Sequence, residues 1–160
     1  MSKIEDVNVK KMTPIHDERG YLYEILRSDW PVFKKFGQLY LTTTYKDAIK
    51  AWHLHEVQTD NICCVHGMIK LVVLDIRRGS LYFGCHQEFF IGENNPCLIT
   101  IPPGIAHGWK CYNSDMAIVI NCPTELYNYS KADEIRFKPD HKFRITDEDF
   151  YQYDWSRKDG

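Results

Sequence analysis

Three histidines in two separate segments are the residues whose types and spacing could do chemistry. His53 and His55 lie in Trp52–Asp60, and His107 ends Pro102–His107. Side chains alternate across a β-strand, so a strand through His53 and His55 would place both imidazoles on one face. Imidazole titrates near neutral pH, and it can serve as a general base or, when neutral, as a metal ligand. The sequence therefore predicts a site with one of these two chemistries.

A metal centre is one interpretation of these histidines. Together with Asp60, residues His53, His55 and His107 would offer three imidazoles and one carboxylate, a set that suits a divalent transition metal such as Fe, Mn, Ni or Zn. The simpler interpretation is structural, with His53 bonded to a backbone carbonyl and His107 completing a turn. Both interpretations stay open beside a catalytic one.

Strand-like runs must position these side chains. Alternating or β-branched stretches occupy Gln38–Tyr45, Ile62–Val65, Met68–Ile76, Leu81–Ile91, Cys97–Ile101, His107–Tyr112 and Met116–Cys122. Strands that recur about every ten residues with turn residues between them predict a β-sandwich or barrel.

Turns and helices are expected at only a few places. His66-Gly67 is expected to form a tight hairpin turn. Helix is expected only as single turns near Trp30–Phe36 and Asp147–Gln152, and the segment after Tyr127 is expected to pack across the barrel.

Composition narrows the class of protein. The chain has 160 residues, with 20 Lys and Arg against 22 Asp and Glu, which predicts one domain over residues 1–160 and argues against a nucleic-acid partner. Apolar runs such as Met116–Ile120 are too short to span a membrane. The six cysteines form no C-x-x-C pair, and Met1–Asp6 lacks an apolar signal segment. We expect reduced cysteines and a cytoplasmic protein.

Two spaced motifs resemble those of the cupin superfamily. The pattern H-x-H, acid, Gly and then P-x-G-x-x-H is met by His53, His55, Asp60, Gly67, Pro102, Gly104 and His107. Within that superfamily the chain resembles the dTDP-4-dehydrorhamnose 3,5-epimerases. The family's D-x-R-G-x-x-x-E, R-G-L-H, V-x-V-D-x-R-x-x-S-x-x-x-G and I-P-x-G-x-A-H-G-F are similar to Asp17–Glu24, Trp52–His55, Val72–Gly84 and Ile101–Trp109.

The resemblance implies a fold and an activity. It implies an all-β, cupin-type jelly-roll with few short helices, assembled as a homodimer. The implied enzyme is an epimerase that removes and returns a proton next to the ketone of a nucleotide-activated 4-keto-6-deoxy sugar, without a cofactor. His55 is then the base, Tyr127 the acid and Asp140 the carboxylate that orients His55. Further substrate contacts are implied for Arg19, Glu24, Gln58, Asp60 and His107.

Two positions depart from the family pattern. Asp60 stands where the family has a lysine, and Trp52 where it has an arginine. A lysine would stabilise an enolate, whereas an ionised Asp60 would repel it unless the carboxyl were protonated or held a metal. Lys50 or Lys110 could replace the missing arginine at a phosphate. A sugar 3,4-ketoisomerase, a metal-dependent cupin enzyme and a non-catalytic nucleotide-sugar binder therefore remain as alternatives.

Overall fold

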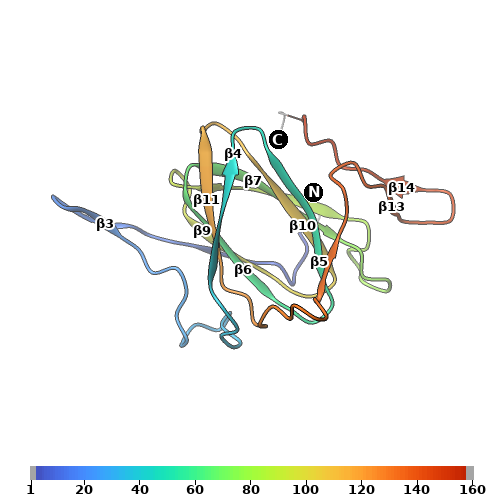
Figure 1. The fold of residues 1–160 in the computed structure, drawn as a ribbon, viewed down its shortest axis with the longest axis horizontal. Helices are drawn as coiled ribbons and strands as arrows, with labels where there is room; N and C mark the ends of the chain where they lie inside the picture. Colours follow the sequence, from blue (N-terminus) through green and yellow to red (C-terminus); the bar gives the residue numbers. More distant parts are fainter. Residues whose placement is uncertain (1–2, 158–160) are drawn as a thin grey trace.

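The computed structural model describes residues 3–157, and two antiparallel five-stranded sheets face each other in it (Figure 1). The first sheet has the order β1-β9-β6-β11-β4 and the second β12-β5-β10-β7-β8. The strands are β1 Asn8–Lys11, β2 Ile15–Asp17, β3 Gly20–Leu22, β4 Tyr40–Tyr45, β5 Ile49–His55, β6 Asp60–His66, β7 Met68–Asp75, β8 His86–Gly92, β9 Cys97–Ile101, β10 Ile105–Cys111, β11 Met116–Asn121, β12 Glu134–Arg136, β13 Phe143–Arg144 and β14 Phe150–Tyr151. This arrangement confirms the predicted all-β, cupin-type jelly-roll.

The space between the sheets is filled mainly by apolar side chains. Alternate residues of β6, β7, β9 and β11 point inward, because side chains on a strand alternate between its two faces. Ile62, Leu71, Val73, Ile99 and Val119 are each at most 1% exposed in this cluster. Their removal from water is the main force that holds the two sheets together.

Chain segments outside the barrel cover the outer faces of both sheets. The outer face of the second sheet packs Trp52 against Phe143, Tyr153 and Trp155 from the C-terminal segment, which confirms that this segment lies across the barrel. Residues 23–32 cover the first sheet in the same way. All eight residues of β7 are consequently buried, since neither of its faces meets water.

The two predicted helical turns are wrong: within residues 3–157 the chain has no helix. Residues 28–32 form turns that bring Trp30 and Val32 onto the first sheet, and this packing replaces a helix. The second segment closes the β13–β14 hairpin, where the Thr146 hydroxyl accepts hydrogen bonds from the backbone N–H groups of Glu148 and Asp149.

The predicted hairpin at His66-Gly67 is also wrong. β6 pairs with β9 and β11, while β7 pairs with β8 and β10, so the turn carries the chain from one sheet to the other. Local turn chemistry specifies the reversal but cannot specify which strands then pair. The run predicted from Leu81 begins as a strand only at His86, because consecutive turns occupy residues 81–84.

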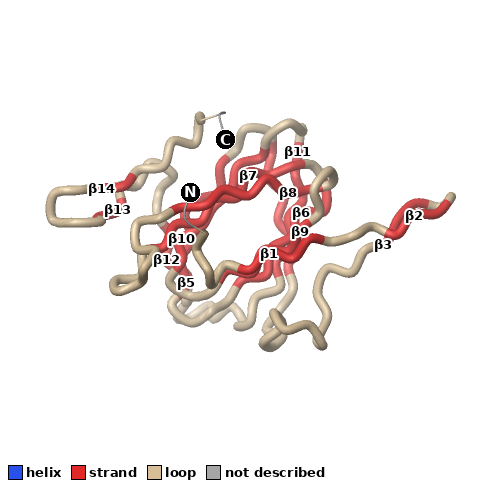
Figure 2. The backbone as a smooth tube through the Cα atoms, turned by 180° about the vertical axis from the view of Figure 1, so that it is seen from behind, coloured by secondary structure: helices blue, strands red, loops and turns tan. Residues whose placement is uncertain are grey.

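One hairpin stands away from the barrel. β2 and β3 pair with each other alone and project outward from the barrel (Figures 1 and 2). Ile15, Tyr21 and Leu22 on this hairpin are 70%, 53% and 61% exposed. All six cysteines are free, as predicted, and no helix of the described chain is long and apolar enough to cross a membrane.

Candidate active site

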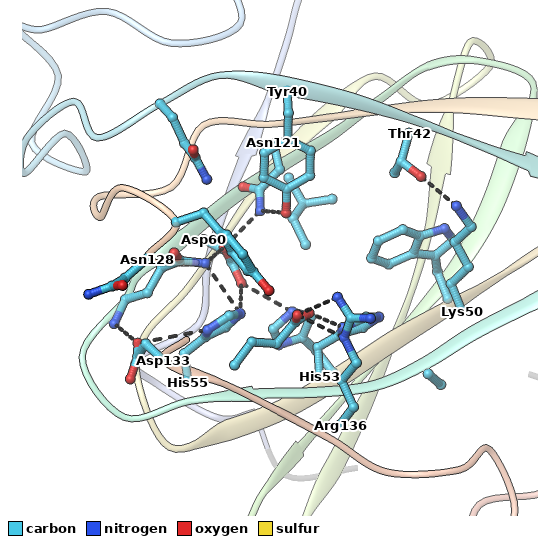
Figure 3. A pocket seen from close by; sticks show the side chains of 18 of the residues that line it. Tyr40, Thr42, Lys50, His53, His55, Asp60, Asn121, Asn128, Asp133 and Arg136 are labelled. Atoms are coloured by element: carbon cyan, nitrogen blue, oxygen red, sulfur yellow. Dashed lines mark hydrogen bonds and ion pairs between the residues drawn. The ribbon is translucent and has the colours of Figure 1, made fainter. Parts of the chain in front are cut away.

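A cavity of about 690 Å³ opens between the two sheets, and polar side chains line it (Figure 3). This volume is in the range of small-molecule sites. The lining includes Gln38, Tyr40, Thr42, Lys50, His53, His55, Gln58, Asp60, His107, Trp109, Asn121, Tyr127, Asp133, Glu134 and Arg136. Both sheets contribute lining residues, because β4, β6 and β11 belong to one sheet and β5, β10 and β12 to the other.

The three predicted histidines form a row on the second sheet. His107 on β10 is paired with His53 on β5, and the ring centroid of His107 lies 5.9 Å from those of both His53 and His55. Gly108 allows this close approach, since a Cβ there would lie 2.4 Å from the Cβ of Ala51. The prediction that His53 and His55 share one face is confirmed.

A tight turn before β10 fixes one end of the same sheet. Gly104 follows two prolines and has a φ of +79°, a conformation that glycine adopts without strain. Its N–H donates a hydrogen bond of 2.8 Å to the carbonyl oxygen of His55. The Pro102–His107 motif therefore holds the end of β5 as well as positioning His107.

Asp60 reaches from the first sheet into the histidine row. Its Oδ1 accepts hydrogen bonds from the amides of Gln58 (2.8 Å) and Asn121 (2.7 Å), and its Oδ2 lies 3.1 Å from Nε2 of His107. Burial raises the pKa of Asp60, but the bond and charge of His107 and the charge of His55 lower it more, so the net pKa lies below its usual value. This direction favours the ionised form of Asp60 over the protonated form considered from the sequence.

His107 lies against that carboxylate. Its Nδ1 faces the carbonyl oxygen of Ile105 at 3.2 Å while its Nε2 faces Asp60. Both ring nitrogens of His107 are therefore occupied by oxygen atoms of the protein.

His55 is held as a neutral base. Burial lowers its pKa, Asp60 opposes this effect, and the charge of His107 lowers the pKa further. Its buried Nδ1 makes no hydrogen bond within residues 3–157 and lies 3.8 Å from Oδ2 of Asp133. We assign the proton of the neutral ring to Nδ1, toward Asp133, which leaves the Nε2 lone pair facing the Gln58 amide at 3.2 Å.

Asp133 is well placed to orient this ring. Its carboxylate accepts hydrogen bonds from the backbone N–H groups of Glu56 (3.1 Å), Val57 (3.1 Å) and Gln58 (2.8 Å), directly after His55 in the chain. Asp140, which the resemblance implied for this role, does not line the cavity and lies instead in a separate shallow pocket beside Tyr153 and Trp155. Asp133, and not Asp140, is thus the carboxylate that lies beside His55 in this structure.

His53 has a different partner. Its Nδ1 lies 2.6 Å from Oε1 of Glu134, and Arg136 also bonds this carboxylate. Burial raises the pKa of Glu134, but the bonds from His53 and Arg136 outweigh it and bring the pKa to about 2. His53 thus pairs with Glu134 on β12 and does not face Asp60.

This engagement bears on the metal interpretation. Within residues 3–157, only His55, Asp60 and His107 form a group that brings one donor atom each within 4.8 Å of one another. Asp60 Oδ1 accepts bonds from two amides, and Asp60 Oδ2 lies 3.1 Å from Nε2 of His107. A metal would have to compete with this hydrogen-bonded network for the same donor atoms.

The other sequence-predicted residues divide into two groups. Gln58, Asp60, His107 and Tyr127 line the cavity, Tyr127 at its mouth with its ring 5.0 Å from that of Tyr129. Arg19 and Glu24 do not line it. Arg19 lies at the tip of the β2–β3 hairpin, paired with Asp17, and Glu24 follows that hairpin and pairs with Arg27.

Of the two lysines that the sequence offered for a phosphate contact, Lys50 lies in the cavity and donates to the Thr42 hydroxyl, whereas Lys110 faces Asp47 outside it. Other lining residues were missed by sequence reasoning. The alternation in Gln38–Tyr45 could have placed Tyr40 and Thr42 on one face. No pattern marks Asp133 or Glu134, because their segment lacks periodicity.

Comparisons with known proteins agree with this geometry. A family profile described as dTDP-4-dehydrorhamnose 3,5-epimerase matches residues 1–160. The chain is 36% identical to a probable low-salt glycan biosynthesis epimerase, Agl13, of Haloferax volcanii, over 92% of this chain and 96% of that one. It is 35% identical to the spore coat polysaccharide biosynthesis protein SpsL of Bacillus subtilis, over 83% and 88%. A crystal structure of a dTDP sugar isomerase from Desulfovibrio desulfuricans superimposes with a TM-score of 0.83 at 26% identity, over 97% of this chain and 94% of the other.

Proposed function

This chain belongs to the dTDP-4-dehydrorhamnose 3,5-epimerase family, and we propose that it epimerises a nucleotide-activated 4-keto-6-deoxy sugar for glycan synthesis. The predicted family and its isomerase class are thereby confirmed. The proposal is carried by one observation: a buried, neutral imidazole, His55, stands beside a carboxylate in a cavity of sugar size. A positioned base of this kind is what the removal of a proton α to a ketone requires.

The first step is removal of the proton by His55. Nε2 takes the hydrogen from the carbon next to the ketone, and the electron pair of the C–H bond moves onto the ketone oxygen as an enolate. The imidazolium that forms is flanked by Asp133 at Nδ1 (3.8 Å) and by Oδ2 of Asp60 at Nε2 (3.3 Å). Asp60 therefore stabilises the protonated base, a role compatible with its ionised state.

The enolate needs positive charge that the family lysine would supply. Lys50 offers an ammonium from β5 at the wall of the cavity. Burial lowers the pKa of Lys50, and an anion bound beside it would favour its charged form. In this proposal Lys50 takes over the electrostatic role of the lysine that Asp60 replaces, or alternatively meets a phosphate.

We also propose that the enzyme is a homodimer in which Arg19 and Glu24 serve the cavity of the partner. Both lie beyond the reach of their own cavity, on or next to the β2–β3 hairpin, whose exposed Ile15, Tyr21 and Leu22 would be covered by a second copy. Light scattering on the purified protein tests this. The double substitution Tyr21→Asp and Leu22→Asp should give monomers, and a monomeric wild type would contradict the proposal.

The activity is tested with dTDP-4-keto-6-deoxyglucose in deuterated water. Nuclear magnetic resonance should show deuterium at C3, C5 or both, together with inverted product. A 4-keto to 3-keto conversion would identify a 3,4-ketoisomerase instead. Binding of the nucleotide sugar without any exchange would identify a non-catalytic binder.

A further inference from the structure

The proposed substrate carries a diphosphate, whose negative charge needs a cation of the protein. The family resemblance implies an arginine for one phosphate contact, at the position where this chain has Trp52. Trp52 is fully buried on the outer face of the second sheet, against Phe143 and Trp155, and does not line the cavity. The phosphate contact therefore has to come from another position.

The cationic side chains that line the cavity within residues 3–157, histidines aside, are Lys50 and Arg136. Lys50 donates to the Thr42 hydroxyl, and burial lowers its pKa, so its ammonium is suited to an anion that forms inside the cavity. The Arg136 side chain is 68% exposed, and a guanidinium stays charged throughout the neutral pH range. Arg136 is therefore the cation that can receive a charged group arriving from water.

Arg136 lies beside the position where the family has its arginine. In the β5–β12 ladder Arg136 pairs with His53, the neighbour of Trp52, and Glu134 pairs with His55. Side chains alternate along a strand, so Glu134 and Arg136 both point toward the cavity (Figure 3). Two residues along a strand span about 7 Å, so a pyranose ring at His55 extends its anomeric phosphate toward Arg136.

Glu134 fixes the guanidinium and leaves one edge of it free. Its Oε2 accepts a hydrogen bond from Nε of Arg136 (2.8 Å) and pairs with Nη2 (2.5 Å), while its Oε1 lies 2.6 Å from Nδ1 of His53. Within residues 3–157, Nη1 of Arg136 makes no hydrogen bond or ion pair. The Nη1–Nη2 edge can therefore donate parallel N–H groups to a phosphate, the bidentate geometry that arginine forms with this group.

We propose that Arg136 binds the diphosphate of the nucleotide sugar in place of the family arginine, and that Glu134 positions it. The free edge of the guanidinium donates to the phosphate on the anomeric oxygen, and no covalent bond changes at this residue. Lys50 then stays with the enolate inside the cavity, which decides between the two roles open to it. This proposal rests on the proposed function, and it concerns the binding of substrate and not the transfer of protons.

Binding of dTDP and of thymidine to the purified protein, measured by calorimetry, tests the proposal. Arg136→Met removes the charge, so dTDP should bind about 10–100-fold more weakly, the range for a lost hydrogen bond to a charged group. Thymidine has no phosphate, and its affinity should not change. Arg144→Met is the matched control, because Arg144 is 55% exposed, pairs with Asp147 and lies outside the cavity.

Epimerisation of dTDP-4-keto-6-deoxyglucose gives a second readout. A group that holds the phosphate equally in the ground state and the transition state affects KM and not kcat. Arg136→Met should therefore raise KM about 10–100-fold and leave kcat within about twofold of the wild type. Arg136→Lys keeps the charge without the bidentate edge, and its KM should lie between the two.

The proposal is overturned if Arg136→Met binds dTDP as tightly as the wild type, or if Lys50→Met shows the loss of dTDP affinity in its place. An equal loss of thymidine affinity also overturns it, because Arg136 would then have a structural role. Absence of deuterium exchange in the wild type would instead refute the proposed function. Should Arg136→Met fail to fold, Arg136→Lys serves: weaker dTDP binding with unchanged thymidine binding supports the proposal, and unchanged dTDP binding overturns it.

Discussion

The barrel interior consists of two regions built from the same strands. Along β6, the inward positions run from Asp60 to Ile62 and Cys64, and along β11 they run from Asn121 to Val119 and Ala117. One end of each strand thus faces the polar cavity, and the rest faces the apolar core. Both regions are buried, yet they are buried for different reasons.

The difference shows how the fold divides stability from chemistry. Apolar side chains gain from leaving water, whereas Asp60 and the histidines are disfavoured by burial until each finds a partner. The core therefore supplies the free energy of folding, and the cavity uses part of it to hold His55 neutral and Asp60 ionised. Substitutions at the two regions should have separable effects.

The largest effect is expected for His55→Asn on catalysis. Loss of a general base lowers rates by about 10²–10⁴-fold, so deuterium exchange into the sugar should fall by that factor. The free energy of unfolding should change little, because the asparagine amide keeps a polar group at the place of Nδ1, toward Asp133. His66→Asn, half-exposed at the opposite turn, is the control. Exchange that persists in His55→Asn would place the base elsewhere.

Leu71→Ala should lower the stability of the protein and leave its catalytic rate nearly unchanged. Leu71 is fully buried in the apolar core, and such truncations cost about 2–5 kcal/mol of unfolding free energy. Chemical denaturation measures this, and the exchange rate of the folded variant should stay near that of the wild type. Leu81→Ala, at 95% exposure, should change stability by less than about 0.5 kcal/mol. A catalytic loss in Leu71→Ala as large as in His55→Asn would erase the distinction between the regions.

Lowering the pH should change the protonation of the cavity residues, whereas the apolar core has no group that titrates in the same range. The pKa of His55 is lowered in the folded protein, so the unfolded chain binds the proton more tightly and stability falls as pH drops below about 6.5. The rate should fall with an apparent pKa below 6.5, by about tenfold per pH unit. Glu134, with a pKa of about 2, stays ionised in this range. Rate profiles and denaturation from pH 8 to 5 test this, and an acid limb above pH 6.5 would contradict it.

Removal of metal ions should not change the activity. Asp60 and His107 contact each other and other protein groups, so dialysis against a chelator should leave the rate of deuterium exchange unchanged. Elemental analysis of the purified protein should find no stoichiometric transition metal. Loss of activity that added metal restores would revive the metal interpretation.

The sequence by itself determined the periodic features of this protein. Alternation placed His53 and His55 on one face, motif spacing brought His107 to the same site, and the strand pattern gave an all-β fold. These features depend on neighbours along the chain, which a periodic pattern records directly.

Only the tertiary structure decided the partners. Asp133 meets backbone groups 75–77 residues away, Tyr40 meets Asn121 from 81 residues away, and the turn at Gly67 leads into a different sheet. No local pattern specifies which distant strand lies alongside or which carboxylate arrives beside a given imidazole. Those choices are made by the packing of the whole barrel, because burial of the apolar core selects one arrangement of the strands and the polar residues follow.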